Sequence, residues 1–92
     1  PAVLERIGSH KEIRLAGVFT HFAKADIPDF TEVQSSEFDA ALSTIRNANF
    51  ATGLVHMASG DAARRFPYTH RDMVRVGLYL YGLEARTESG VV

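Results

Sequence analysis

Hydrophobic residues in the first part of the chain follow two different spacings, which predict a helix and then a strand. Val3, Leu4 and Ile7 recur at helical spacing behind an initial proline, a residue that suits a first helical turn. We expect this helix to end at Gly8. Residues 15–20, LAGVFT, form instead a short apolar run without polar alternation. Such a run is typical of a parallel strand that is covered on both faces.

A second helix is predicted over residues 32–46. Its apolar residues follow one another at spacings of four and three from Phe38 to Ile45, which places them on one helix face. Thr31, with Gln34 three residues later, has the sequence of a capping box. We therefore expect the helix to begin immediately after this threonine.

The second half of the chain repeats the order of strand, polar end and helix. Residues 51–57, ATGLVHM, predict a second strand, and residues 61–66, DAARRF, predict a short helix that Pro67 stops. Apolar residues alternate with other residues over 73–81, and this periodicity alone predicts one continuous third strand. Gly77 interrupts that pattern.

The resulting order of helices and strands predicts a parallel α/β arrangement with right-handed crossovers. We treat residues 1–92 as one domain or a part of one, with the last ten residues frayed. Ligands of parallel α/β proteins bind at the carboxyl ends of the strands. Polar or small residues fall at all three predicted ends: Thr20, His21, His56, Ser59, Gly60 and Gly77. These ends define one candidate binding rim.

Composition narrows the class of protein. Hydrophobic residues make up 46% and charged residues 23% of the 92, as in a soluble globular unit. The formal charge of −1 gives no field that would attract nucleic acid or an anionic membrane. With no cysteine and no apolar run near the roughly 20 residues of a membrane span, a cytoplasmic origin is the default. An initial proline in place of methionine fits a cut or engineered fragment.

Three strings in this order, LAGVFTHFAKAD, HMASGDAARRFP and DMVRVGLYLYGL, resemble the pyridoxal-phosphate barrel domain of bacterial alanine racemases. The resemblance covers about residues 13–83. It implies a partial parallel (β/α)₈ barrel of the TIM type, with about three strands and intervening helices, corresponding to the C-terminal part of the barrel domain. It also implies an enzyme that uses pyridoxal 5'-phosphate to interconvert L- and D-alanine, and D-alanine is a peptidoglycan precursor. The resemblance further implies that the enzyme works as a homodimer.

The resemblance assigns cofactor contacts to individual residues. Arg75 matches the arginine that hydrogen-bonds the pyridine nitrogen of the cofactor. His21 matches the histidine that contacts this arginine. Gly77 and Leu78 match backbone donors to the phosphate, and the resemblance implies that Gly77 ends the strand and that Leu78 to Tyr81 begin a helix. His56 matches a histidine at the end of the preceding strand, for which we favour the role of a core histidine bonded to backbone.

The predicted phosphate site departs from the family pattern at Gly60. Gly60 matches a position usually held by a phosphate-binding serine, and Ser59 with Gly60 stands where an Asn-Ser pair is common. Asp61 adds a carboxylate beside them, which weakens the inferred site unless this side chain caps a helix or points away. The alternative is that Gly60 and Gly77 only permit tight turns.

The resemblance also identifies what this chain lacks. The family forms its Schiff base on a lysine at the first barrel strand and uses a tyrosine from the other subunit, and neither Lys11 nor Lys24 has the matching position. We assign no catalytic residue and expect that the chain alone does not racemise alanine. Its expected partners are the remainder of the barrel or other copies of itself, and a small amino acid as substrate.

Four other interpretations remain open. The chain could be a self-associating structural fragment without ligand, or part of a related barrel that acts on another amino acid. Arg75 could pair with Asp72 in a purely structural role. A metal site is the weakest interpretation, because the histidines and aspartates that could form it have no compact ligand spacing.

Overall fold

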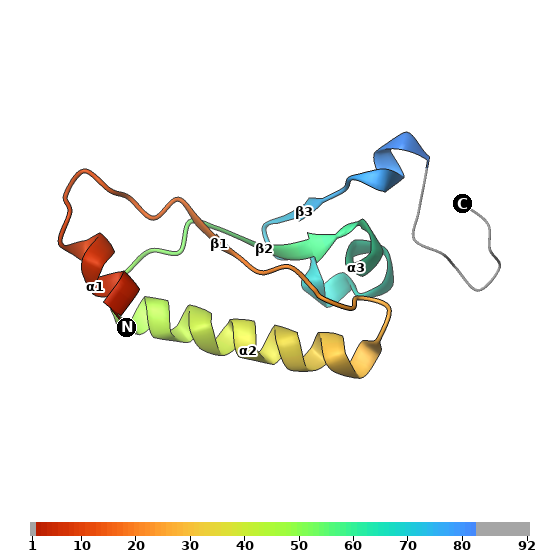
Figure 1. The fold of residues 1–92 in the computed structure, drawn as a ribbon, viewed down its shortest axis with the longest axis horizontal. Coiled ribbons are helices and arrows are strands. Elements are labelled where there is room, and N and C mark those ends of the chain that lie inside the picture. The colour runs from red at the N-terminus through yellow and green to blue at the C-terminus, as the bar shows by residue number, and fades with distance from the viewer. Residues whose placement is uncertain (1, 83–92) are drawn as a thin grey trace.

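Three parallel strands and their connecting helices form the framework of the chain (Figure 1). The structure is a computed structural model, and it describes residues 2–82. The helices are α1 (Ala2–Gly8), α2 (Pro28–Asn47) and α3 (Gly60–Arg65), and the strands are β1 (Gly17–Phe19), β2 (Leu54–Ser59) and β3 (Met73–Arg75). Two 3₁₀ turns complete this part of the chain, η1 (Pro67–Thr69) and η2 (Leu78–Tyr81). The expected fraying of the last ten residues falls outside the described range.

The sheet has the order β1-β2-β3, and both strand pairs are parallel. Phe19 is the register partner of His56, and Ser59 is the partner of Arg75. All three carboxyl ends therefore lie at one edge of the sheet, on the right in Figure 1. The predicted parallel α/β arrangement is confirmed.

The start of α2 differs from the prediction. The helix begins at Pro28, with Ile27 in the N-cap position, and not immediately after Thr31. Proline suits this position because a first-turn residue needs no amide hydrogen. The Thr31 hydroxyl lies inside the first turn and donates to the carbonyl oxygens of Ile27 and Lys24, at 2.9 and 3.2 Å. The capping-box prediction is wrong, because Gln34 bonds elsewhere.

The third strand is shorter than the alternation of residues 73–81 predicted. β3 contains three residues, and η2 follows as a turn of helix. Leu78 and Leu80 are 60% and 77% exposed, so their apolar side chains find no sheet face to cover. The backbone at Gly77, with φ −99° and ψ −84°, leaves the extended region between the two elements. The alternative that the resemblance implied, a helix from Leu78 to Tyr81, describes this segment correctly.

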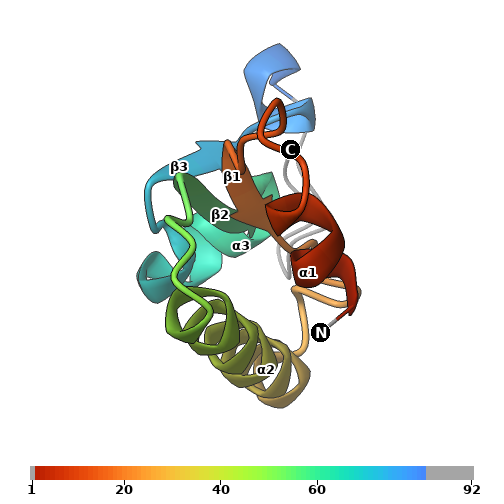
Figure 2. The ribbon, with the colours of Figure 1, turned by 90° about the vertical axis from the view of Figure 1, so that its left-hand side faces the viewer.

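Within residues 2–82, helices cover one face of the sheet and leave the other open. In Figure 2 the sheet lies above α2, with α3 behind it. A buried cluster fills the space between them: Phe22, Phe38, Leu42, Val55, Met57, Ala58 and Ala62. On the other face Phe19 and Leu54 are 63% and 54% exposed. The expectation that the strands are covered on both faces is therefore wrong for this chain, since three strands do not enclose the interior that a complete barrel fills with side chains.

The open arrangement also appears in the dimensions of the molecule. Its radius of gyration is 15.7 Å, against about 12 Å for a compact chain of this length. Among residues 2–82, no helix combines the length and the apolar character that crossing a membrane requires.

Gly53 allows β1 and β2 to begin their pairing. Its φ is +63°, a left-handed conformation that residues with a Cβ rarely adopt. An added Cβ would also overlap the carbonyl oxygen of Ala16, which accepts the amide hydrogen of Leu54 at 3.1 Å. A side chain at residue 53 would therefore push the first rung of the sheet apart.

We predict that Gly53→Ala lowers the free energy of unfolding by about 3 kcal/mol, the sum of left-handed strain and overpacking. Gly82→Ala is the matched control, because Gly82 has a φ of +78° but no atom within 4 Å of an added Cβ. It should cost only the conformational part, about 1 kcal/mol. Urea unfolding followed by circular dichroism measures both, and equal losses would contradict the role given to Gly53.

Candidate active-site pocket

Arg75 ends β3, and its guanidinium joins the end of β1 to the middle of β2. Nη1 donates to Nδ1 of His56 at 2.6 Å. Nη2 donates to the carbonyl oxygens of Thr20 and Met57, at 3.1 and 3.4 Å, and to Nδ1 of His21 at 3.3 Å. The side chain is half-buried, and these partners offset the cost of removing its charge from water.

These bonds fix the protonation of two imidazole nitrogens. A guanidinium has only donors, so each imidazole must present a lone pair at Nδ1. His56 and His21 therefore carry no proton on Nδ1 while the bonds to Arg75 exist. In a neutral imidazole this places the hydrogen on Nε2.

Phe19 covers the bond between Arg75 and His56 on the open face of the sheet. Its ring stacks on the His56 ring, with centroids 5.1 Å apart and planes inclined by 5°. The guanidinium carbon of Arg75 lies 5.4 Å from the Phe19 centroid. A cation over an aromatic face at such a distance contributes about 0.5–1 kcal/mol where it is exposed. Phe19 thus helps to fix the plane of the imidazole.

Gln34 of α2 fixes the loop that carries His21. Its Nε2 donates to the Thr20 hydroxyl at 3.2 Å and to the His21 carbonyl oxygen at 2.7 Å. Its Oε1 accepts the amide hydrogen of Ala23 at 3.2 Å. The glutamine that the sequence suggested for a capping box therefore serves as a clamp, and it ties the strand end of β1 to α2.

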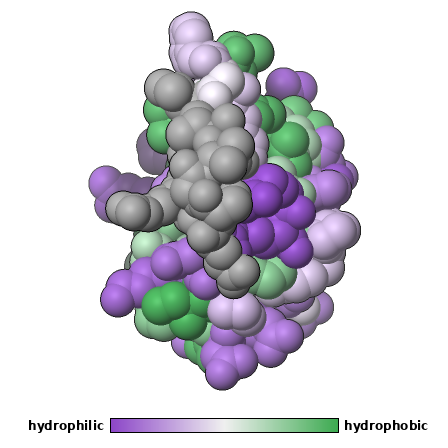
Figure 3. Space-filling model, turned by 90° about the vertical axis from the view of Figure 1, so that its right-hand side faces the viewer, coloured by the Kyte–Doolittle hydropathy of each residue, from purple (hydrophilic) through white to green (hydrophobic). Residues whose placement is uncertain are grey.

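A pocket of about 520 Å³ opens beside Arg75. Residues from all three strand ends line it: His21, Ser59, Gly60, Asp61, Arg75, Val76, Gly77, Leu78 and Tyr79. The six residues that the sequence predicted for the cofactor site are all among them. Figure 3 looks onto the side where the strands end, and hydrophobic and strongly hydrophilic residues lie side by side on it. The structure brings the predicted residues together, and their contact with a cofactor stays a prediction.

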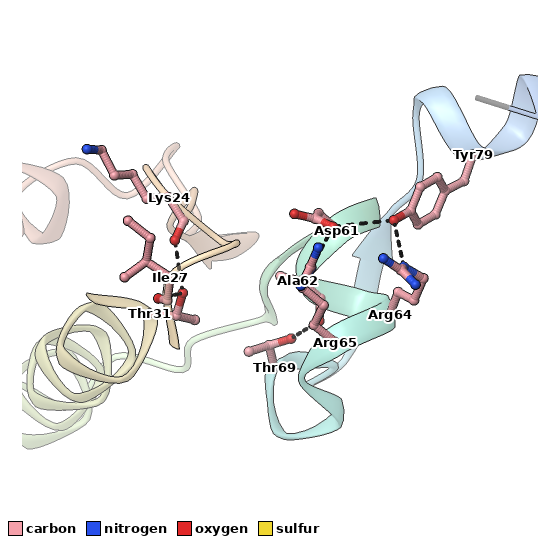
Figure 4. A network of polar contacts seen from close by, with 9 residues as sticks. All are labelled: Lys24, Ile27, Thr31, Asp61, Ala62, Arg64, Arg65, Thr69 and Tyr79. Atoms are coloured by element: carbon pink, nitrogen blue, oxygen red, sulfur yellow. Dashed lines mark hydrogen bonds and ion pairs between the residues drawn. The ribbon is translucent and has the colours of Figure 1, made fainter. Parts of the chain in front are cut away.

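Asp61 is held by cationic and phenolic partners (Figure 4). Its Oδ1 accepts a hydrogen bond from Nε of Arg65 at 3.0 Å and one from the Tyr79 hydroxyl at 3.4 Å. This bonding raises the pKa of Arg65 above its ordinary value. The negative charge of Asp61 is therefore matched by a guanidinium within the same helix, which relieves its conflict with an anion in the pocket.

Two expectations about individual residues need correction. His56 is a direct partner of Arg75 and not a core histidine bonded to backbone. Asp72 is not the ion-pair partner of Arg75. Its carboxylate instead accepts the amide hydrogen of Val55 at 2.8 Å and continues the β2–β3 pairing. The sequence carried no signal for this contact of His56, since His56 lies inside the run LVHMA and its bond to Arg75 depends on the register of the strands. Within residues 2–82, no group of three or more potential metal ligands comes together.

Comparisons with known proteins agree with this geometry. Residues 1–85 match the family model described as "Alanine racemase, N-terminal domain". Alanine racemase 2 of Bacillus subtilis (strain 168) is 39% identical over 83 residues, which are 88% of this chain and 21% of that protein. Alanine racemase 1 of Oceanobacillus iheyensis is 38% identical over 76 residues, covering 79% of this chain and 20% of that protein.

A crystal structure of alanine racemase from Bacillus anthracis with bound L-Ala-P has a TM-score of 0.86 and 31% identity, over 92% of this chain and 22% of that one. The chain thus spans about a fifth of the length of the relatives that it matches. The three strands and their helices are a piece of that barrel fold. The matched family model is described as the N-terminal domain of the enzyme, and the place of this chain at the C-terminal part of that domain stays a prediction.

We predict that ¹⁵N chemical shifts of the His56 ring will show the neutral tautomer with its hydrogen on Nε2. Arg75→Met removes the donor opposite Nδ1, so the tautomer ratio of His56 should shift toward a mixture. His70 is the control, because its Nε2 lies 2.7 Å from the Ala63 carbonyl oxygen and is remote from Arg75 in the bonding scheme. A proton on Nδ1 of His56 in the unsubstituted chain would contradict the assigned bond.

Proposed function

The chain belongs to the alanine racemase N-terminal domain family, and we propose that its pocket is the cofactor pocket of a racemase that interconverts L- and D-alanine. In this proposal the 92 residues are a single partial barrel domain that holds pyridoxal 5'-phosphate. The observation that carries it is the placement of Arg75, bonded to His21 and His56 and lining one pocket with Gly60 and Gly77.

The donor set of Arg75 fits the cofactor's pyridine nitrogen. A guanidinium remains protonated at any ordinary pH and can only donate, so it suits a ring nitrogen that presents a lone pair. The two imidazoles and two carbonyl oxygens around it hold the guanidinium in place before a ligand arrives. Arg75 would bind the ring nitrogen, and His21 and His56 would orient Arg75.

The opposite side of the pocket suits the phosphate. Gly77 has no atom within 4 Å of the position of an added Cβ, so a ligand can approach its backbone closely. We assign the backbone of Gly77 and Leu78 to the phosphate, together with Ser59 and Gly60 at the end of β2. This assignment follows the resemblance, and the pairing of Asp61 with Arg65 makes it compatible with an anion.

The chemistry comes from the cofactor, which withdraws electrons from the α-carbon of a bound amino acid. The residues of this chain bind and orient. Because Arg75 does not give up its proton, it leaves the ring nitrogen unprotonated and limits how strongly the ring withdraws electrons. In this way Arg75 would favour the removal and return of one α-proton over competing reactions.

The groups that exchange the proton are assigned to other parts of the enzyme. In the family they are a lysine and the other subunit's tyrosine, and we propose that this chain alone does not racemise alanine. The uncovered sheet face and both outer strands need partners, because unpaired strand edges and apolar faces associate. The partner is the remainder of the barrel or further copies of this chain.

A second candidate function is self-association without a ligand. Apolar side chains border the outer edge of β1 and the start of α2, where Ile27, Phe30 and Val33 are 41%, 48% and 60% exposed. Together with Phe19 they line one groove. A fragment whose only role is to assemble would need this surface and would leave Arg75 without a ligand.

We predict that pyridoxamine 5'-phosphate binds the chain at least about tenfold more weakly after Arg75→Ala, because a hydrogen bond with a charged partner is lost. Pyridoxamine phosphate is the preferred probe, since it has no aldehyde that could react with surface lysines. Isothermal titration calorimetry gives the affinity.

Arg71→Ala is the matched control for this titration. It removes the same charge from an arginine whose Nη1 bonds Asp39 at 2.8 Å, outside the pocket. Its affinity should equal that of the unsubstituted chain. Equal affinities for Arg75→Ala and Arg71→Ala, or no binding by the unsubstituted chain, would favour the self-associating structural role.

A further inference from the structure

Within the described residues 2–82, Tyr79 is the side chain that fastens the η2 turn to α3. Leu78, Leu80 and Tyr81 of the same turn are 60%, 77% and 80% exposed. Tyr79 is half-buried. The turn follows a strand of only three residues, so its position depends strongly on this one side chain.

The ring of Tyr79 packs directly on Gly60. A Cβ added at Gly60 would lie 3.0 Å from Cδ2 of the ring and 3.3 Å from both Cε2 and Cγ. Contacts this short require the ring or the backbone to move. The ring therefore occupies the space that a side chain at residue 60 would need, and the two positions are sterically coupled.

The hydroxyl of Tyr79 fixes the ring from its far end. It accepts a hydrogen bond from Nε of Arg64 at 3.1 Å and donates to Oδ1 of Asp61 at 3.4 Å. Asp61 is itself held by Arg65. Figure 4 shows the phenol reaching from η2 toward these three side chains of α3. The hydroxyl thus accepts one hydrogen bond and donates another, and the two bonds together define the position of the phenol oxygen.

We infer that Tyr79 is a positioning residue, which holds the backbone of Gly77 and Leu78 against the end of β2 and thereby disfavours a side chain at residue 60. The consequence for binding rests on the proposed function, in which this backbone contacts the phosphate. Tyr79 has no hydrogen bond with Arg75, His21 or His56. We therefore expect it to affect the phosphate side of the pocket and not the side that holds the ring nitrogen.

A double-mutant cycle tests the coupling without any ligand. Gly60→Ser should lower the midpoint of thermal unfolding by about 4 °C or more in the chain that keeps Tyr79, through overpacking. In the Tyr79→Ala background the serine has room, and the same substitution should leave the midpoint nearly unchanged. An equal effect of Gly60→Ser in both backgrounds overturns the inference.

Backbone dynamics test the positioning role itself. In Tyr79→Ala, the heteronuclear ¹H–¹⁵N Overhauser values of the Gly77 and Leu78 amides should fall to those of a mobile segment. Tyr79→Phe keeps the ring on Gly60 and should produce a smaller fall. Tyr81→Ala is the matched control, because Tyr81 is an exposed tyrosine of the same turn, and it should leave these values unchanged. Unchanged values in Tyr79→Ala overturn the inference.

Ligand titrations separate this inference from the proposed function. Tyr79→Ala should weaken pyridoxamine phosphate about tenfold and leave the affinity for pyridoxamine, which lacks the phosphate, unaltered. If the unsubstituted chain binds neither probe, the proposed function fails, while the thermal cycle and the amide measurements still decide the role of Tyr79. If pyridoxamine phosphate binds Tyr79→Ala as tightly as the unsubstituted chain, the proposed function stands and the positioning role is overturned.

Discussion

The guanidinium of Arg75 can donate hydrogen bonds but cannot accept them, and this constraint determines the arrangement of the three strand ends. Each neighbour has to offer a lone pair, which the structure supplies as two carbonyl oxygens and two imidazole Nδ1 atoms. These acceptors come from the end of β1 and the middle of β2, while the arginine ends β3. Only a parallel sheet with all carboxyl ends at one edge brings them within reach of one side chain.

The same sheet explains why the chain leaves apolar surface uncovered. Val18, Val55 and Val74 face the helices and take part in or pack against the buried cluster, whereas Phe19 and Leu54 project from the opposite face. Alternation along a strand makes these two sets unavoidable. In a complete barrel the second face would turn inward and be filled by side chains of the other strands. The hydrogen bonds of Arg75 are thus formed in this chain, although the apolar residues Phe19 and Leu54 of the same sheet face are exposed.

Sequence patterns predicted the order of helices and strands better than the residues at which each one begins and ends. Helical periodicity identified α2 because its apolar face packs on the sheet, but the Thr31–Gln34 pair suggested the wrong start, since Gln34 finds partners in the β1–α2 loop. Alternation over residues 73–81 failed because periodicity records which residues are apolar and not whether a surface exists to cover them. Gly77 carried the correct signal there.

The pocket was predictable to a different extent on its two sides. Residues around Arg75 were found because charged and titratable side chains stand out after an apolar run. His56 was underrated, because its role depends on its register with Phe19 and on the Arg75 side chain, which no linear pattern contains. Tyr79 gave no signal of its own, since an aromatic residue in an apolar segment suggests packing and nothing more.

The departure from the family pattern at residues 59–61 looks different once Tyr79 is placed. Taken singly, a glycine without a hydroxyl and an aspartate beside it both argue against an anion nearby. In the structure the glycine accommodates the Tyr79 ring, the aspartate accepts the Tyr79 hydroxyl, and Arg65 matches the added charge. Replacing any one of them alone would leave a clash, an unmatched carboxylate or an unanchored ring. Gly60, Asp61 and Tyr79 are therefore better understood as one coupled group of the pocket wall than as separate residues.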